Sequence, residues 1–318
     1  MNHTKQIEKF YIYNYACSEE EDQLCRLEMR ALFGVNAVSK VMESSLCVDP
    51  SRSPFIRGRL DVIFQGNKID EIFDQVKGLP DIAETFKVEF IKLSTNAEQE
   101  QIEYSERLKL VRAVGSIVKG KADLHNPEKI FGILFLEGRW IFGVYHENKA
   151  IWLQHKQKPH SYSTALNTRV ARAIVNIAVP NPIGIKVIDP CCGIGTVLVE
   201  ALSMGIKITG SDINPLVMKG ARENIAHFGL SGEVALKDIR EISSNYDVAI
   251  IDLPYNLCSV ITIEEQLEML ECAREFARKV VLVTVEQIDS IIDKAGFQIT
   301  DRCELKKRTF TRQVIVCE

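Results

Sequence analysis

Apolar runs and helical patterns alternate along the second half of the chain. The strand-like runs are 185–188, 206–210, 234–236, 248–251 and 280–285, and helical spacing appears at 197–204, 215–228, 263–276 and 287–294. The run Val248-Ala249-Ile250-Ile251 is apolar at every position, which is typical of a strand buried on both faces of a parallel sheet. Two last runs, 297–305 and 309–316, flank a basic turn and predict a terminal hairpin. This half therefore predicts a doubly wound α/β domain.

The first half combines helices with antiparallel strand patterns. Strands are predicted at 10–15, 60–64 and 88–93, a hairpin at 130–136 and 140–145, and helices at 19–33 and 104–118. Such a mixture favours an α+β fold. The turn at Leu79-Pro80 is the expected boundary between two small subdomains. We therefore predict domains at 1–79 and 80–148, a linker at 149–164 and an α/β domain at 165–318.

Composition limits the class of protein. The chain has 318 residues, of which 46% are hydrophobic and 26% charged, so it can bury a sizeable core. Its uncharged apolar runs fall far short of the roughly 20 residues that cross a bilayer. None of the nine cysteines has Cys-x-x-Cys spacing, and the six histidines are scattered. We expect a cytoplasmic protein without a metal site or membrane association.

The charge distribution has one local exception to its average. The formal net charge is −4, which argues against a protein that coats nucleic acid. No acidic residue lies between Glu147 and Asp189, however, and this stretch carries several bases. The candidate RNA-binding residues there are Lys156, Lys158, Arg169 and Arg172. A single basic run is often only a solvated face, so both interpretations stay open.

The strongest local motif is Asp189-Pro190-Cys191-Cys192-Gly193-Ile194-Gly195-Thr196, at the junction of a predicted strand and helix. Its glycines let the backbone approach a ligand closely, and the helix presents free amide groups. Leu198 stands where a dinucleotide-binding loop has its third glycine, and no Gly-Lys-Ser/Thr follows. NAD, FAD and an ATP-hydrolysing loop are therefore disfavoured.

Acidic residues recur at the ends of four predicted strands: Asp189, Asp212, Asp238 and Asp252. Ligands of open α/β sheets bind outside these carboxyl ends. Asp212 could accept the hydroxyls of a ribose, and Asp238 could accept an adenine amino group. Each residue alone could be a helix cap or a turn residue. Their shared register predicts a nucleoside site.

The motif Asp252-Leu253-Pro254-Tyr255 suits chemistry on an amino group. A carboxylate and a carbonyl that accept its hydrogens would keep the nitrogen lone pair out of an aromatic ring and in line with a methyl donor. Proline adds no competing amide donor, and Tyr255 offers a face for a flipped base. We expect Asp252 to act in its ordinary ionised form. The alternative is a strand-ending turn in which Pro254 and Tyr255 only pack.

Together the two motifs resemble those of the amino-group methyltransferases that use S-adenosylmethionine, Asp-Pro-x-x-Gly-x-Gly-Thr and Asp/Asn-x-Pro-Tyr/Phe. Residues 120–127 and the hairpin after them resemble the end of a THUMP domain, an RNA-binding module. Residues 158–163 with 169–173 are similar to the linker and entry helix of the THUMP-containing tRNA guanosine N2-methyltransferases, a UPF0020-type family. Residues 10–33 resemble the N-terminal ferredoxin-like piece of that family. The resemblance covers essentially the whole chain.

This resemblance implies a cofactor, a partner and a set of site residues. S-adenosylmethionine would bind through Asp189, Gly193, Gly195, Thr196, Asp212, Ile213, Asp238 and Ile239. Asp212 would face the ribose, and Asp238 and Ile213 the adenine. Asp252 and Pro254 would hold the target amino group, and Tyr255 would stack on the base. The implied substrate is the N2 amino group of a guanosine in tRNA, with guanosine 10 as a candidate position.

Two other classes of function remain open on the sequence. An Asp-x-Pro-Tyr motif could hold any target amino group, including one in DNA or in a protein amide. A non-catalytic RNA-binding protein with a relic methylase fold is a further alternative.

Overall fold

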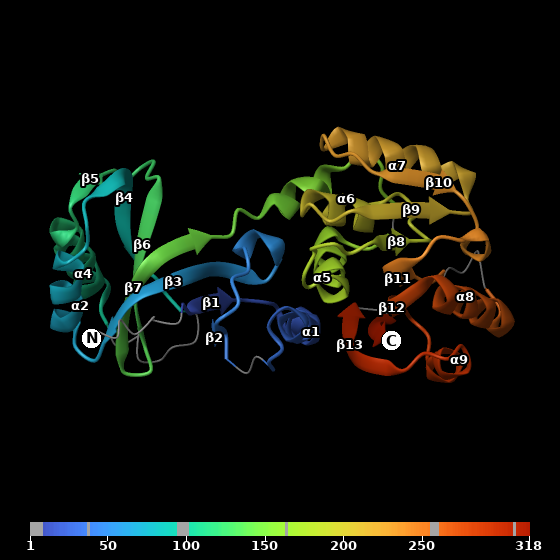
Figure 1. Ribbon diagram of the computed structural model, residues 1–318, viewed down its shortest axis with the longest axis horizontal. Coiled ribbons are helices and arrows are strands. Elements are labelled where there is room, and N and C mark those ends of the chain that lie inside the picture. Colours follow the sequence, from blue (N-terminus) through green and yellow to red (C-terminus); the bar gives the residue numbers. More distant parts are fainter. Residues whose placement is uncertain (1–8, 37–38, 94–101, 163–164, 255–260, 308–309) are drawn as a thin grey trace, which may run out of the picture. The chain divides into compact units, whose positions relative to one another are not determined.

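The computed structural model describes residues 9–36, 39–93, 102–162, 165–254, 261–307 and 310–318. The chain divides into two compact units (Figure 1). Unit 1 comprises Met1–Ala16, Ala37–Ser51 and Phe55–Lys149, and unit 2 comprises Cys17–Asn36, Arg52–Pro54 and Ala150–Glu318. Each unit contains a seven-stranded sheet.

Unit 2 is the predicted doubly wound α/β domain. Its strands are β8 (Val187–Asp189), β9 (Ile208–Asp212), β10 (Glu233–Leu236), β11 (Tyr246–Asp252), β12 (Ala277–Thr284), β13 (Ile299–Lys307) and β14 (Phe310–Cys317). The sheet order is β10-β9-β8-β11-β12-β14-β13. The first five strands are parallel, whereas β14 runs antiparallel to both of its neighbours. The predicted strands and the antiparallel terminal pair are confirmed.

Helices cover both faces of this sheet, because its central strands are apolar at successive positions. The helices of unit 2 are α1 (Asp22–Phe33), α5 (Thr168–Ala178), α6 (Thr196–Ser203), α7 (Pro215–His227), α8 (Ile263–Phe276) and α9 (Asp289–Lys294). Ala249 and Ile251 of β11 pack with α8 and α9 in one apolar cluster. On the other side, α5 contacts β11 and β12. Side chains of Asn167, Asn214 and Thr262 cap α5, α7 and α8, and α7 and α8 begin where the sequence pattern predicts.

Helix α1 packs with α5 in unit 2, although the sequence analysis placed it in a domain at 1–79. The Glu28 carboxylate of α1 is fully buried, where it accepts hydrogen bonds from the Ser53 hydroxyl at 2.5 Å and the Asn176 amide at 2.6 Å. At the end of the same helix, Arg30 forms a bidentate ion pair with Asp301 of β13 at 2.8 Å. These long-range contacts, which local patterning does not encode, attach α1 to unit 2.

Unit 1 has the predicted α+β character. Its strands are β1 (Tyr11–Tyr15), β2 (Val41–Ser44), β3 (Ile56–Gly66), β4 (Ile82–Phe90), β5 (Gly120–Ala122), β6 (Lys129–Leu136) and β7 (Arg139–Glu147), in the order β2-β1-β3-β7-β6-β4-β5. Helices α2 (Ile69–Lys77) and α4 (Tyr104–Ile117) cover the sheet around Phe86, Phe131 and Phe142. The hairpin β6–β7 is confirmed, with Glu137 and Gly138 both at positive φ in its turn.

The sequence analysis missed β2, β5 and α2, and it started β4 six residues too late. In the predicted linker, residues Ile151–Gln157 form a 3-10 helix, η3.

Candidate functional site

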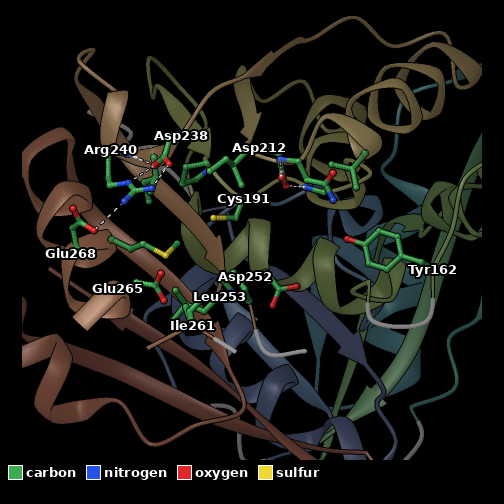
Figure 2. Close-up of a pocket in the computed structure, with 18 residues that line it drawn as sticks. Tyr162, Cys191, Asp212, Asp238, Arg240, Asp252, Leu253, Ile261, Glu265 and Glu268 are labelled. Atoms are coloured by element: carbon green, nitrogen blue, oxygen red, sulfur yellow. Dashed lines mark hydrogen bonds and ion pairs between the residues drawn. The ribbon is translucent and has the colours of Figure 1, made fainter. Parts of the chain in front are cut away.

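A cavity of about 450 Å³ lies at the carboxyl ends of the parallel strands of unit 2 (Figure 2). Of the predicted site residues, those that line it are Gly193, Asp212, Ile213, Asp238, Ile239, Asp252 and Pro254. They come from separate segments of the chain, which the parallel strand order brings to one edge of the sheet. Asp189, Gly195 and Thr196 are not among the lining residues. Tyr255 lies outside the described residues.

Asp212 joins the glycine loop to the end of β9. Its Oδ2 accepts a hydrogen bond from the Gly193 N–H, and its Oδ1 accepts one from the Asn214 N–H, both at 2.8 Å. Gly193 and Gly195 have φ of +52° and +76°, in the left-handed region that favours glycine. Because a carboxylate offers about four acceptor positions, Asp212 can still accept hydroxyl groups from the cavity.

Asp189 lies behind the loop. It is 3% exposed, its Oδ1 accepts from the Cys191 N–H at 3.2 Å, and burial raises the pKa of Asp189 well above its usual range. This position suits a residue that shapes the loop. The Thr196 hydroxyl is buried and has no hydrogen-bond partner among the described residues.

Asp238 is held by Arg240, a residue that the sequence analysis missed. Oδ1 of Asp238 accepts from Nε of Arg240 at 2.9 Å, and Oδ2 accepts from Nη2 at 2.6 Å. These hydrogen bonds hold the pKa of Asp238 below its usual value. Arg240 also pairs with Glu268 of α8 at 3.3 Å, so a cation bridges η4 (Ile239–Glu241) and α8 at this end of the cavity (Figure 2). The one feature of the sequence that could have identified Arg240 as a site residue is its position two residues after Asp238.

Asp252 differs from its expected state. Burial of its carboxyl group raises the pKa of Asp252 to about 7, and the positive charge of Arg312 opposes this effect. Its Oδ1 atom is buried and accepts no hydrogen bond from the described part of the chain. The prediction of an ordinary ionised carboxylate is therefore corrected, because the apolar strand ends beside Leu253 withdraw this group from water. A carboxylate that lines a cavity and has spare acceptor capacity among the described residues is suited to a ligand N–H.

The cavity is acidic. Asp212, Asp238, Asp252, Glu265 and Glu268 line it, and Arg240 is the one basic residue among its described lining residues. Such a lining favours a ligand that carries positive charge.

The four predicted RNA-binding residues are in different environments. Lys156 is exposed, and its ammonium lies 5.5 Å from the centre of the Trp152 ring. The Arg169 guanidinium lies 5.4 Å from the same ring and pairs with Glu21 at 3.1 Å. Burial lowers the pKa of Lys158, which is partly exposed.

Arg172 requires a correction. It is 2% exposed, and its Nη1 donates to Oε2 of Glu200 at 2.8 Å. Oε1 of the same carboxylate pairs with His155 at 2.7 Å. Arg172 therefore belongs to a buried polar network, because its position in α5 faces α6 and not solvent, and this placement argues against contact with RNA.

Two further properties concern the described residues alone. No group of three or more His, Cys, Asp or Glu side chains among them could hold a metal ion. None of their helices is long and apolar enough to span a membrane.

Comparison with known proteins gives one family match within unit 2 and several relatives, one of which matches most of the chain. Residues 155–291 match the UPF0020 family, described as an RMKL-like methyltransferase domain. A tRNA (guanine(10)-N2)-dimethyltransferase of Methanothermobacter thermautotrophicus is 27% identical over 277 residues, which cover 79% of this chain and 78% of the relative. A tRNA (guanine(10)-N(2))-methyltransferase of Saccharomyces cerevisiae is 28% identical over 57% of this chain and 47% of the relative. The U6 snRNA (guanine-N(2))-methyltransferase THUMPD2 of Mus musculus is 28% identical over 42% of this chain and 26% of the relative. Residues 155–291 of this chain thus form a methyltransferase domain of the UPF0020, RMKL-like family.

Proposed function

We propose that this chain transfers a methyl group from S-adenosylmethionine to the exocyclic N2 amino group of a guanosine in tRNA. The observation that carries the proposal is Asp252, which lines the cavity together with Gly193 of the glycine loop and Asp212 and whose Oδ1 accepts no hydrogen bond from the described residues. The guanine-N2 activity of the relatives supports the choice of target group.

The chemistry of the cavity lining suits the cofactor. Asp212 would accept the ribose hydroxyls, while Ile213, Ile239 and the Asp238–Arg240 pair would surround the adenine. The acidic lining suits the positive sulfonium and ammonium groups. When bound, S-adenosylmethionine would supply an electrophilic methyl group.

Asp252 would act on the target nitrogen. In its ionised form the carboxylate accepts an N–H of the guanine amino group, which keeps the nitrogen lone pair out of the ring. With a pKa of about 7, the same carboxylate can take the proton that this nitrogen loses on methylation. Pro254, which also lines the cavity, adds no competing amide donor. Tyr255 would stack on the base.

The RNA would contact unit 1, as a THUMP region, and the basic segment of unit 2. Lys156, Lys158 and Arg169 are the candidates there, because Arg172 is buried. A tRNA substrate also favours the expected cytoplasmic location. Methylation of DNA or of a protein amide, and RNA binding without catalysis, are the competing functions.

Methyl transfer to an unmodified tRNA transcript tests the proposal. Labelled S-adenosylmethionine should yield N2-methylguanosine in the nucleoside digest, and mass spectrometry of fragments would locate it. A transcript with inosine at the mapped position is the matched control, because inosine lacks the amino group and should accept no methyl. Asp252→Ala should abolish transfer but leave cofactor binding nearly intact, since the lost contact acts mainly in the transition state.

Three results would contradict the proposal. Label in duplex DNA or in a glutamine peptide, with none in tRNA, would support the other amino-group substrates. Cofactor and RNA binding without any transfer would support the non-catalytic alternative. A fully active Asp252→Ala variant would move the acceptor role to another group.

A further inference from the structure

Residues 158–162, which we call the strap, lie against the glycine loop, and one buried amide joins the two segments. Asn224 of α7 is fully buried. Its Oδ1 accepts a hydrogen bond from the His160 N–H at 2.9 Å. Its Nδ2 donates to the His160 carbonyl at 3.1 Å and to the Ile194 carbonyl at 2.9 Å. The strap and the loop therefore share one positioning side chain.

The surface of α7 is shaped to accept the strap. A Cβ at Gly220 would lie 3.3 Å from Cγ of His160 and 3.4 Å from Cγ2 of Ile194, so a larger residue at this position would require the strap to shift by a few tenths of an ångström. On the neighbouring turn of the helix, Glu223 pairs with Nε2 of His160. These contacts hold His160 from its backbone and its side chain.

Tyr162 extends from the strap over the glycine loop. It lines the cavity, and a Cβ at Gly193 would lie only 2.5 Å from its hydroxyl oxygen. Figure 2 shows the Tyr162 hydroxyl directed towards the cavity, at the opposite end from Arg240 and Glu268. The two ends of the cavity therefore differ in chemistry: one has an arginine, and the other has a phenol beside the glycine loop.

We propose that Tyr162 closes the end of the cavity that takes the amino-acid part of S-adenosylmethionine, and that its hydroxyl hydrogen-bonds this part. The inference rests on the proposed function. Asp238 and Ile239 occupy the adenine end with Arg240, so the amino-acid part has to lie at the end under Tyr162. A carboxylate there is remote from Arg240 and needs other donors. The Tyr162 hydroxyl is one such donor, and a phenol can also accept from the ammonium group.

Paired ligands test this assignment by calorimetry on the full chain. S-adenosylhomocysteine carries the amino-acid part, whereas 5′-methylthioadenosine lacks it but keeps the adenosine. Tyr162→Phe should weaken binding of S-adenosylhomocysteine roughly tenfold, as expected for a lost hydrogen bond to a charged group. Binding of methylthioadenosine should be unchanged. Ser161→Ala, an exposed change in the same strap, is the control and should affect neither ligand.

Asn224→Asp tests the positioning role. This change keeps the acceptor for the His160 N–H but removes the donor to both carbonyls. It should reproduce the ligand selectivity of Tyr162→Phe, with weaker S-adenosylhomocysteine binding and unchanged methylthioadenosine binding. An equal loss for both ligands would show a merely structural role and overturn this part of the inference.

These experiments distinguish a failure of the proposed function from a failure of the inference about Tyr162. If the unmodified protein binds neither ligand, the proposed function falls together with the inference. If it binds both and Tyr162→Phe binds S-adenosylhomocysteine with unchanged affinity, the inference alone falls. A loss confined to the KM for tRNA would also overturn it, because Tyr162 would then face the RNA.

Discussion

Replacing Asp252 with asparagine should stabilise the protein at neutral pH while it abolishes methyl transfer. The pKa of Asp252 is about 7, against a reference value of 3.8. Between these values the folded state binds one more proton than the unfolded state, so stability falls as pH rises from about 4 to about 7. A difference of about 3 pKa units corresponds to a loss of about 4 kcal/mol.

Asparagine is neutral throughout this pH range, so the Asp252→Asn variant should not lose stability in this way as the pH rises. The free energy of unfolding of Asp252→Asn should therefore match that of the unmodified protein near pH 4 and exceed it by up to about 4 kcal/mol above pH 7. Arg312 and Asp189, the charged groups that interact with Asp252, are present in both proteins. Their own contributions largely cancel in the comparison.

Urea unfolding between pH 4.5 and 8 measures this difference, with the slope m as a check that both proteins expose the same surface. Asp81→Asn, an exposed change in unit 1, is the matched control and should show little difference at any pH. The activity of the unmodified enzyme should change in the opposite sense, with kcat/KM rising with pH and levelling above about 7 as the carboxylate ionises. A stability difference that does not vary with pH would refute the reasoning, because Asp252 would then be ionised in the folded protein.

Other changes test the remaining contacts. Asp212→Ala should weaken cofactor binding by about 1–3 kcal/mol in calorimetry, because it removes the acceptor of the loop amide and of the ribose; unchanged affinity would contradict this role. Arg172→Met should lower stability by about 3–5 kcal/mol, because it removes the guanidinium partner of the buried Glu200 carboxylate and leaves that carboxylate paired with His155 alone among the described residues. It should also leave the salt dependence of RNA binding unaltered, whereas Lys156→Gln should reduce the slope by roughly 0.7–0.9; the reverse pattern would restore Arg172 as an RNA contact. Gly210→Ala should cost about 1–3 kcal/mol by overpacking, because its Cβ would lie 2.4 Å from Cδ1 of Leu198. A second change, Leu198→Ala, should recover part of that loss in thermal unfolding, and a simple sum of two losses would argue against the clash.

The architecture of unit 2 could be predicted because its signals are local. Strands such as β11 are apolar at every position, glycines mark the loop after β8, and acids follow the strands. Once the strands are parallel, their carboxyl ends meet at one edge of the sheet, so Asp212, Asp238 and Asp252 share a cavity. The strand-end acids and this geometric rule were sufficient to locate the cavity.

Unit 1 was less predictable. The strand β2 has only four residues and the helix α2 only nine. Pairing with β1 in the sheet and packing against α4 stabilise them, and these interactions join segments that are distant in the sequence.

The sequence by itself determined which side chains follow each strand of unit 2, since the hydrophobic period and the turn residues act within a few positions of one another. Only the tertiary structure decided how these and other side chains are protonated, exposed to solvent and positioned. Burial raises the pKa of Asp252, Arg172 is buried in an ion pair with Glu200, and Asn224 joins the strap that carries Tyr162 to the glycine loop. Solvation and long-range hydrogen bonding depend on neighbours that are tens of residues away in the chain, and folding alone brings them together.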